Sequence, residues 1–517
     1  MNFKGDFHLL SKINSMGLNG IDGYLVGVET DIGNGLPAFD VVGLPDAAVK
    51  ESRERVRAAM KNCGLTYPTQ RITVNLAPAN IKKAGPIYDL PICIGLLASS
   101  QQLNADLSNY AFVGDIALSG ELRPIVGALP MAICAAENGI KNIILPAQNA
   151  AEAAVVKDLN VFGAANLLDI IKHFITEEKL KKTEIDIDKI FSHQTDSLLD
   201  FADVKGQENV KTALEIAAAG GHNCLLIGSP GSGKTMLAQR LPSILPALSL
   251  YEALEVTKIH SIAGLLPQNV PLITMRPFRS PHHSITANGL SGGGSMPRPG
   301  EISLAHNGVL FLDELPEFKK DALEVLRQPM EDGVVTISRV NATLTYPSSS
   351  MVVAAMNPCK CGYFGDSTRK CTCSEQQIRQ YLGKISGPLL DRIDLHIEVP
   401  AVKYRDLTDG KPVEPSAEIR KRVEAARKIQ ENRFQGEKNV HCNAQMTPKM
   451  VEEFCPLGTE ESKLLKDAFH NLGLSARAHN RILKVSRTVA DLKGSAKIKR
   501  EHLAQAIFYR SLDRKYW

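Results

Sequence analysis

The sequence predicts an α/β protein with a phosphate-binding parallel sheet at its core and an all-α C-terminal region. Three observations carry this prediction. Short apolar segments alternate with helical patterns in the first 400 residues, a glycine-rich loop stands between a strand and a helix, and only helical patterns follow residue 401. The length of 517 residues is enough for about three domains.

The composition excludes several classes of protein. The chain is 44% hydrophobic, 22% charged and 5% aromatic, which excludes a disordered, collagen-like or coiled-coil protein. No apolar run reaches the roughly 18 residues of a membrane span, and the N-terminal residues show no signal peptide. We therefore expect a cytoplasmic protein with no membrane partner. Ten cysteines are too few for a disulfide scaffold.

Hydrophobic patterning divides the chain into four regions. A first α/β domain has strand patterns at 72–76 and 142–146 and a helical pattern at 128–139. It is followed by a polar, charged linker, by a second α/β unit, and by four helical patterns that predict an all-α lid. The predicted boundaries are 1–172 for the first domain, 173–198 for the linker, 199–400 for the second unit and 401–517 for the lid.

The strongest motif is a phosphate-binding loop. CLLIGSPGSGKT (224–235) runs from an apolar strand into a helix and fits the pattern GxxxxGK[ST]. Backbone N–H groups and the helix N-terminus cradle phosphates in such a loop, while Lys234 reaches the β- and γ-phosphates and Thr235 ligates Mg²⁺. The predicted ATP-binding residues of the loop are Gly228, Ser229, Pro230, Gly231, Ser232, Gly233, Lys234 and Thr235.

Two further apolar strands end in residues suited to ATP hydrolysis. GVLFLDEL (308–315) delivers Asp313, which would hold Mg²⁺ through water, and Glu314, which would activate the attacking water as general base. MVVAAMNP (351–358) ends in Asn357, which either orients that water or only caps its strand.

Two arginines are candidates for sensing the γ-phosphate. Arg392 in SGPLLDRIDLHIEV (386–399) either reaches the nucleotide of a neighbouring subunit or pairs with Asp391 or Asp394. Arg477 in LSARAHNR (474–481) opens a lid helix and would sense the nucleotide from the lid.

Four cysteines are crowded into fifteen residues. Their thiolates can close a tetrahedral Zn²⁺ site, and the alternative is four free thiols in a loop. The short polar segment between the two C-x-C pairs needs a cross-link to stay ordered, so we assign a structural metal without a catalytic role. The four-cysteine loop (359–373) contains Cys359, Cys361, Cys371 and Cys373.

Three segments are candidates for binding a polyanion. From residue 401 onward, 24 Lys and Arg face 15 Asp and Glu, a surplus that indicates either a polyanion surface or a solvated helical face. DGVVTISRVNATLTYP (332–347) predicts a hairpin with Arg339 near its tip, and the alternative is a plain surface hairpin. Residues 256–300 contain no Asp or Glu and are predicted to be loop-rich. The basic residues considered there and in the lid are Lys258, Arg276, Arg279, Arg298, Arg481, Lys484, Arg487, Lys497, Lys499 and Arg500.

These motifs together resemble those of AAA+ ATPases. RPFRSPHHSIT (276–286) and NPCKCGYFGD…KCTCS…SGPLLDRIDL narrow the resemblance to magnesium-chelatase-like ATPases of the ComM/YifB family, over essentially the whole chain. The resemblance implies an ATP- and Mg²⁺-dependent ring that acts in DNA branch migration. It also implies that the 332–347 hairpin enters the pore of the ring and that Val204 and Gly206 lie beside the adenine.

The first domain is similar to the Lon-protease and ribosomal-S5-domain-2 fold. AGPIYDLP (84–91) matches the segment that carries the nucleophilic serine of Lon, but this chain has Ile87 there. The segment at 126–146 matches the one that carries the lysine base, where this chain has Pro130. The resemblance therefore implies the fold without peptidase activity, because Ser–Lys acylation has neither nucleophile nor base.

The predicted function is a Mg²⁺/ATP-dependent hexameric ring motor that acts on DNA as a helicase or branch-migration factor in recombination or DNA uptake. One alternative is a chelatase motor that drives metal insertion into a tetrapyrrole, which the RPFRSPHH relationship permits. Another is a Lon-like binding module regulated by ATP. DNA-stimulated ATP turnover favours the first function and porphyrin-dependent turnover the second.

Overall fold

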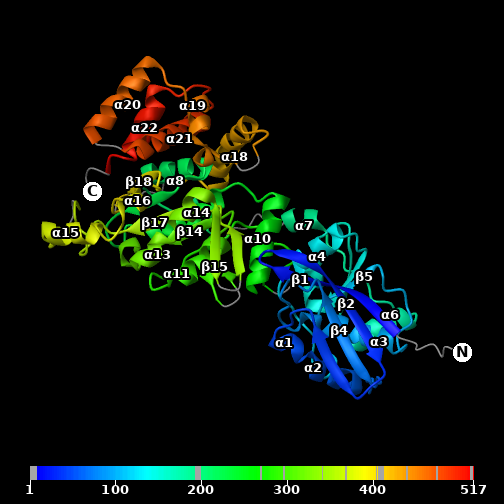
Figure 1. Ribbon diagram of the computed structural model, residues 1–517. Coiled ribbons are helices and arrows are strands. Elements are labelled where there is room, and N and C mark those ends of the chain that lie inside the picture. Colours follow the sequence, from blue (N-terminus) through cyan, green and yellow to red (C-terminus); the bar gives the residue numbers. More distant parts are fainter. Residues whose placement is uncertain are drawn as a thin grey trace, which may run out of the picture. The chain divides into compact units, whose positions relative to one another are not determined.

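The computed structural model of the chain describes residues 9–192, 199–267, 270–294, 297–339, 342–366, 369–402, 405, 413–437, 440–472, 475–512 and 516. They form two compact units, which are coloured along the sequence in Figure 1. The first unit contains Met1–Ser192 and Ala253–Ile273, and the second contains His193–Glu252 and Thr274–Trp517.

A seven-stranded mixed sheet forms the centre of the first unit, in the order β3-β4-β2-β1-β5-β8-β9. The strands β1, β2 and β4 pair antiparallel and the remaining neighbours pair parallel. The predicted strands at 72–76 and 142–146 are confirmed as β4 and β8. The strands are β1 (Leu9–Asn19), β2 (Asp22–Gly33), β3 (Ala38–Val42), β4 (Arg71–Ala77), β5 (Tyr110–Phe112), β8 (Asn142–Pro146) and β9 (Asn160–Ala164).

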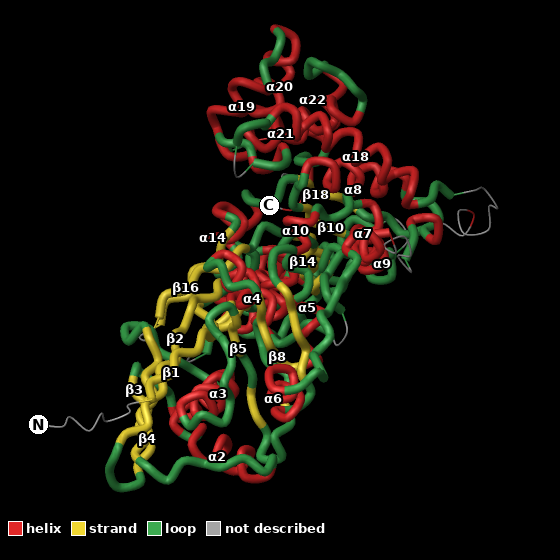
Figure 2. Tube along the Cα trace, turned by 90° about the vertical axis from the view of Figure 1, so that its right-hand side faces the viewer, coloured by secondary structure: helices red, strands yellow, loops and turns green. Residues whose placement is uncertain are grey.

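Helices cover both faces of this sheet because successive apolar residues of its strands point to opposite faces. Phe112 and Ile144 pack with the cluster that includes α2 and α3, which lie beside the strands in Figure 2, whereas Ala111 and Ile143 pack with α4. The helix predicted at 128–139 is confirmed as α4. The helices are α1 (Ala47–Lys50), α2 (Ser52–Asn62), α3 (Asp89–Ser99), α4 (Ala128–Glu137), α5 (Ala150–Ala153), α6 (Leu167–Ile175) and α7 (Ile187–Ser192), and β6 (Asp115–Ile116) and β7 (Leu122–Arg123) form a short hairpin.

The segment predicted as a linker is partly built into the first unit. It contains the end of α6 and the whole of α7, and the Thr183 N–H donates to the carbonyl of Val161 in β9. Because this pairing uses backbone groups, the polar side chains of the segment did not indicate it. Residues 193–198 lie outside the described part of the chain.

A five-stranded parallel sheet forms the core of the second unit, in the order β11-β14-β17-β10-β18, and confirms the predicted parallel-sheet core. Its central strands are completely buried, and because all five strands run parallel, their carboxyl ends meet at one edge. The strands are β11 (Phe278–Arg279), β14 (Val309–Leu312), β17 (Met351–Met356), β10 (Cys224–Ile227) and β18 (Leu395–Glu398).

The segment at 256–300 is more ordered than its sequence suggested. It begins within α10, and the part of this helix from Ala253 onward belongs to the first unit, where Ser261 donates to the buried carboxylate of Glu152. Apart from α10 (Leu250–Ala263), the elements of the second unit before the lid and outside the sheet are α8 (Glu208–Gly220), α9 (Lys234–Arg240), α11 (Ala287–Ser291), β12 (Gly292–Gly293), β13 (Arg298–Pro299), α12 (Glu301–Leu304), α13 (Lys320–Glu324), α14 (Arg327–Asp332), β15 (Val334–Arg339), β16 (Ala342–Pro347), α15 (Glu375–Leu382) and α16 (Gly387–Leu390).

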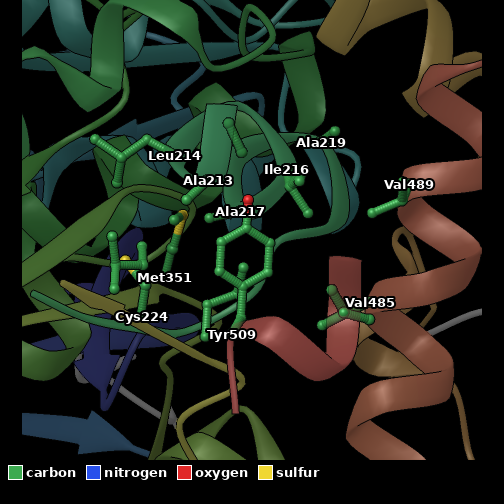
Figure 3. Close-up of a cluster of buried hydrophobic side chains, with 14 of the residues drawn as sticks. Ala213, Leu214, Ile216, Ala217, Ala219, Cys224, Met351, Val485, Val489 and Tyr509 are labelled. Carbon is green, nitrogen blue, oxygen red and sulfur yellow. The ribbon is translucent and has the colours of Figure 1, made fainter. Parts of the chain in front are cut away.

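The described part of the lid is helical, as predicted. Its helix α21 packs on the core, because Val485 and Val489 belong to the same buried cluster as Ile216 and Ala219 of α8, the helix that precedes β10 (Figure 3). The lid helices are α18 (Ser416–Arg433), α19 (Pro448–Phe454), α20 (Thr459–Leu472), α21 (Ala476–Leu492) and α22 (Arg500–Phe508), of which α19 was not predicted. Among the described residues, no helix combines the length and apolarity needed to cross a membrane.

Candidate active site

The phosphate-binding loop connects β10 to α9 at the carboxyl edge of the parallel sheet. Gly231 and Gly233 have φ of +77° and +88°, a backbone conformation that favours glycine. A Cβ on Gly228 would lie 2.3 Å from the Val399 carbonyl oxygen, so this close approach of two strands also requires glycine. The loop therefore has the open backbone that an oxyanion of a phosphate needs, ahead of the first N–H groups of α9.

The side chain of Lys234 folds back so that its ammonium group lies within the phosphate-binding loop. The Nζ atom donates to the carbonyl oxygens of Gly228 and Ser229 at 2.8 and 3.0 Å and to Asn357 Oδ1 at 3.2 Å. Burial lowers the pKa of Lys234, and the nearby Asp313 carboxylate opposes this effect. The contact with Asn357 joins the ends of β10 and β17, so Asn357 lies against the predicted phosphate site as well as ending its strand.

Thr235 and Asp313 form a pair of oxygen donors suited to Mg²⁺. The Thr235 hydroxyl donates to Asp313 Oδ2 at 2.7 Å. Mg²⁺ prefers hard oxygen ligands and keeps several waters, so this pair fits a magnesium ion that also contacts nucleotide phosphates. When bound, the ion would neutralise charge on the β- and γ-phosphates.

Glu314, the predicted general base, follows β14 directly. Its φ of +52° is in the left-handed region, and its N–H donates to Asp313 Oδ1 at 2.9 Å. Its carboxylate lies 3.3 Å from Nδ1 of His283. His283 was not among the predicted site residues, although the sequence signal was present in RPFRSPHHSIT.

The predicted adenine-side residues lie at the turn before α8. Val204 is fully buried in the core of the unit and Gly206 has φ of +68°. The neighbouring Gln207, which was not predicted, donates from Nε2 to the carbonyls of Ser232 at 2.7 Å and Pro400 at 3.0 Å. Gln207 thus ties this turn to the phosphate-binding loop.

The two predicted sensor arginines have different surroundings. Arg392 is buried, and its guanidinium contacts Glu331 at 2.5 Å and the Pro388 carbonyl at 2.6 Å. Its carboxylate partner is therefore neither Asp391 nor Asp394. Arg477 is exposed in the first turn of α21.

The four predicted metal ligands lie together, with Cys359 buried and all four sulfurs within 4.8 Å of one another. Three sulfur–sulfur distances are 3.4, 3.5 and 3.7 Å, close to the roughly 3.8 Å expected for tetrahedral Zn²⁺ with Zn–S bonds of about 2.3 Å. Desolvation raises the pKa of Cys361, but backbone hydrogen bonds from Thr372 and Tyr363 together with hydrogen bonds from Cys359 and Cys371 lower that pKa to about 5. This donor set fits zinc in a structural role.

The four-cysteine loop also touches the phosphate-binding loop. Gly362 has φ of +88°, and a Cβ added there would lie 2.5 Å from Cδ of Pro230. Since Cys359 follows Asn357 by only two residues, the proposed metal site is linked to the ATP site both through the chain and through this packing contact.

Of the four arginines predicted to bind DNA, two are held in ion pairs and two are exposed. Arg276 pairs with Glu252 at 3.2 Å, and Arg279 makes two hydrogen bonds to Glu301 at 2.7 and 2.8 Å. Both carboxylates come from just outside the acid-free 256–300 segment. Arg298 is exposed, and so is Arg339, whose guanidinium donates to Asn288 Oδ1 at 2.8 Å. Val340 and Asn341 at the hairpin tip lie outside the described residues.

Half of the basic lid residues singled out in the sequence are held within the fold. Arg481 pairs with Asp394, Arg487 pairs with Asp491, and Lys484 is partly buried and donates to a backbone carbonyl. Lys497, Lys499 and Arg500 are the other three. All three are exposed. Of these six cations, the three that remain available to a polyanion lie in the segment that leads into α22.

Comparison with known proteins identifies the family. Family models match three consecutive parts of the chain: "Subunit ChlI of Mg-chelatase" at 28–149, "Magnesium chelatase, subunit ChlI" at 200–407 and "Magnesium chelatase, subunit ChlI C-terminal" at 413–510. The chain is 45% identical over 508 residues to competence protein ComM of Haemophilus influenzae, with 98% of each chain covered. The chain belongs to the magnesium-chelatase-like ComM/YifB family.

Other relatives of this ComM/YifB protein match either the whole chain or part of it. It is 44% identical over 512 residues to the uncharacterized protein YifB of Escherichia coli, with 98% of each chain covered. Lon protease 1 of Hydrogenovibrio crunogenus is 31% identical over 106 residues, which is 20% of this chain and 13% of that protein. This likeness confirms the Lon-like fold of the first domain. The parallel sheet and phosphate-binding loop of the second unit have the architecture of an AAA+ ATPase.

Proposed function

We propose that the protein is a Mg²⁺/ATP-dependent ring motor that acts on DNA, as a helicase or branch-migration factor in recombination or DNA uptake. The observation that carries the ATPase part is the convergence of Lys234, Thr235, Asp313 and Asn357 at one edge of the sheet, with Glu314 beside them. Lys234 holds the phosphates, Thr235 and Asp313 hold Mg²⁺, and Glu314 takes the proton of the attacking water.

Exposed basic groups and one relative support DNA as the substrate. Arg298 and Arg339 on the second unit and Lys499 and Arg500 on the lid are exposed cations that can contact phosphates without reading sequence. A full-length relative is named a competence protein, which supports a role in the uptake or recombination of DNA.

A ring is proposed because we expect ATP hydrolysis to need an arginine that stabilises the charge on the γ-phosphate. Arg392 would supply it from a neighbouring subunit, and this requires its ion pair with Glu331 to open. A head-to-tail contact repeated in this way closes a ring, which we propose to be a hexamer.

The four-cysteine loop is proposed to hold one structural Zn²⁺, and the runner-up function is a chelatase motor for a tetrapyrrole. The names of the matching family models favour that alternative. The deciding experiment is ATP turnover with single-stranded, duplex and four-way-junction DNA, beside turnover with a porphyrin. Stimulation by DNA supports the DNA motor, and stimulation by porphyrin alone supports the chelatase motor.

A further inference from the structure

The four-cysteine loop carries three exposed cations, Lys360, Arg369 and Lys370, that neither the ATP site nor the DNA contacts named above use. We propose that this loop is a binding site for single-stranded DNA. In this site the two lysines contact phosphates, and Arg369, held on the ring of Tyr363, stacks on an unpaired base. The inference rests on the proposed function, because it names a further contact of the motor with its DNA.

The region from the first of the four cysteines to the end of α15 has a surplus of positive charge. Arg379 and Lys384 are used in ion pairs, with Glu375 at 3.7 Å and Glu317 at 3.2 Å. Lys360 and Lys370, by contrast, form no ion pair with any residue in the described part of the chain. Between residues 359 and 384 the cations are Lys360, Arg369, Lys370, Arg379 and Lys384, and the acids are Asp366 and Glu375.

The sulfur cluster brings the two unpaired lysines to one place. Lys360 follows Cys359 and Lys370 precedes Cys371, and the sulfurs of these two cysteines lie 3.7 Å apart. Residues that are distant in the loop are thus held beside one centre, which a bound metal would fix in place. Because lysine is a point charge on a flexible stem, two lysines at one centre can each contact a phosphate of the same strand.

Arg369 and Tyr363 form a platform in the same loop. The guanidinium carbon of Arg369 lies 4.6 Å from the centroid of the Tyr363 ring, and Nη1 donates to the Tyr363 hydroxyl at 2.9 Å. Unpaired bases stack on guanidinium planes and on aromatic rings. An exposed arginine that is already held over a ring is therefore a preformed stacking surface. Since a base must leave the duplex to stack on it, the platform favours single-stranded DNA over duplex DNA.

The loop is anchored on the core while its cations face solvent. Gly362 is buried, and its packing against Pro230 leaves no room for a side chain. The helix α15, which continues the chain after the loop, lies at the outer edge of the second unit in Figure 1. This helix also exposes Gln376 and Gln380, whose amides can donate to phosphates. A rigid base with exposed donors is what a site for a flexible strand requires.

The test measures binding of the full-length protein to a fluorescent poly-dT strand and to a duplex of equal length, at several salt concentrations. Lys360→Ala combined with Lys370→Ala should lower the log–log salt slope on the single strand by about 1.4, or about 0.7 for each lost phosphate contact. Arg369→Ala should weaken binding of the single strand at least about fivefold and affect the duplex less.

Two controls accompany these variants. Lys61→Ala combined with Lys141→Ala removes the same charge from exposed positions of the first unit and should leave the slope unchanged. Zinc is measured in every variant, so that loss of a contact is separated from loss of the loop. If the lysine pair loses zinc, Arg369→Ala decides, because Arg369 is not adjacent to a cysteine.

The outcomes separate this inference from the proposed function. If the wild type binds the single strand and the loop variants bind it as the control pair does, the loop site is wrong while the DNA motor stands. Lysine variants that lose zinc, beside an Arg369→Ala protein with unchanged DNA binding, would show that the lysines only neutralise the thiolates. Loop variants that assemble poorly with ATP but bind DNA normally would assign this surface to a neighbouring subunit, which also overturns the inference. A wild type that binds no DNA at low salt would refute both proposals.

Discussion

Replacing Gly362 with alanine tests whether the four-cysteine loop supports the phosphate-binding loop. The new Cβ would lie 2.5 Å from Cδ of Pro230, and φ of +88° adds the strain of a left-handed residue. The backbone strain amounts to about 1–2 kcal/mol, and overpacking at such a contact costs about 1–3 kcal/mol. The overpacking is relieved only if Pro230 moves, and Pro230 belongs to the phosphate-binding loop. We therefore expect ATP to bind at least about fivefold more weakly.

A matched control separates the two effects. Gly436 has φ of +97°, and a Cβ added there would meet nothing within 4 Å, so Gly436→Ala carries the backbone strain alone. The assay is the Kd of a fluorescent ATP analogue for both variants and for Gly362→Ala combined with Pro230→Ala, which should recover affinity because the clashing ring is gone. Equal affinity in Gly362→Ala and Gly436→Ala, or no recovery in the double variant, would refute the packing argument.

The ring, the metal and the DNA surface can each be tested separately. Mixing inactive Arg392→Ala subunits with inactive Glu314→Gln subunits should restore part of the ATP turnover, since some interfaces regain a complete site; no recovery in rings shown to be mixed contradicts a role across subunits. Elemental analysis of protein never exposed to chelator should find about one zinc per chain, and chelation should expose the loop to protease; far less zinc would overturn the assignment. Lys499→Ala should lower the log–log salt slope of DNA binding by about 0.7–0.9, and an unchanged slope would remove Lys499 from the DNA surface.

The phosphate-binding loop and the strand ends could be predicted because their chemistry depends on neighbours in sequence. The glycine turn, Lys234 and Thr235 follow one strand, and Asp313 and Glu314 follow another. Parallel strands then bring these ends to one edge of the sheet. The same reasoning placed Asn357, whose contact with Lys234 the structure shows.

The partners of charged residues could not be predicted, because they depend on tertiary packing. Arg276 and Arg279 lie in a stretch without acids, yet Glu252 and Glu301 reach them from either side of it. The partner of Arg392 is Glu331, which is remote in the chain and not among its sequence neighbours. Net charge likewise could not show that three lid cations are used inside the fold.

In the proposed motor, ATP hydrolysis at Glu314 moves DNA. The most direct measurement follows migration of a four-way junction with Mg²⁺ and ATP by the wild type and by Glu314→Gln, with ATP affinity measured for both. We predict that the wild type moves the junction and that Glu314→Gln binds ATP with similar affinity but turns over about 10²–10⁴-fold more slowly and leaves the junction in place. Two results would contradict this proposal. The first is wild-type protein that hydrolyses ATP but neither moves DNA nor responds to it. The second is Glu314→Gln protein that hydrolyses ATP at the wild-type rate.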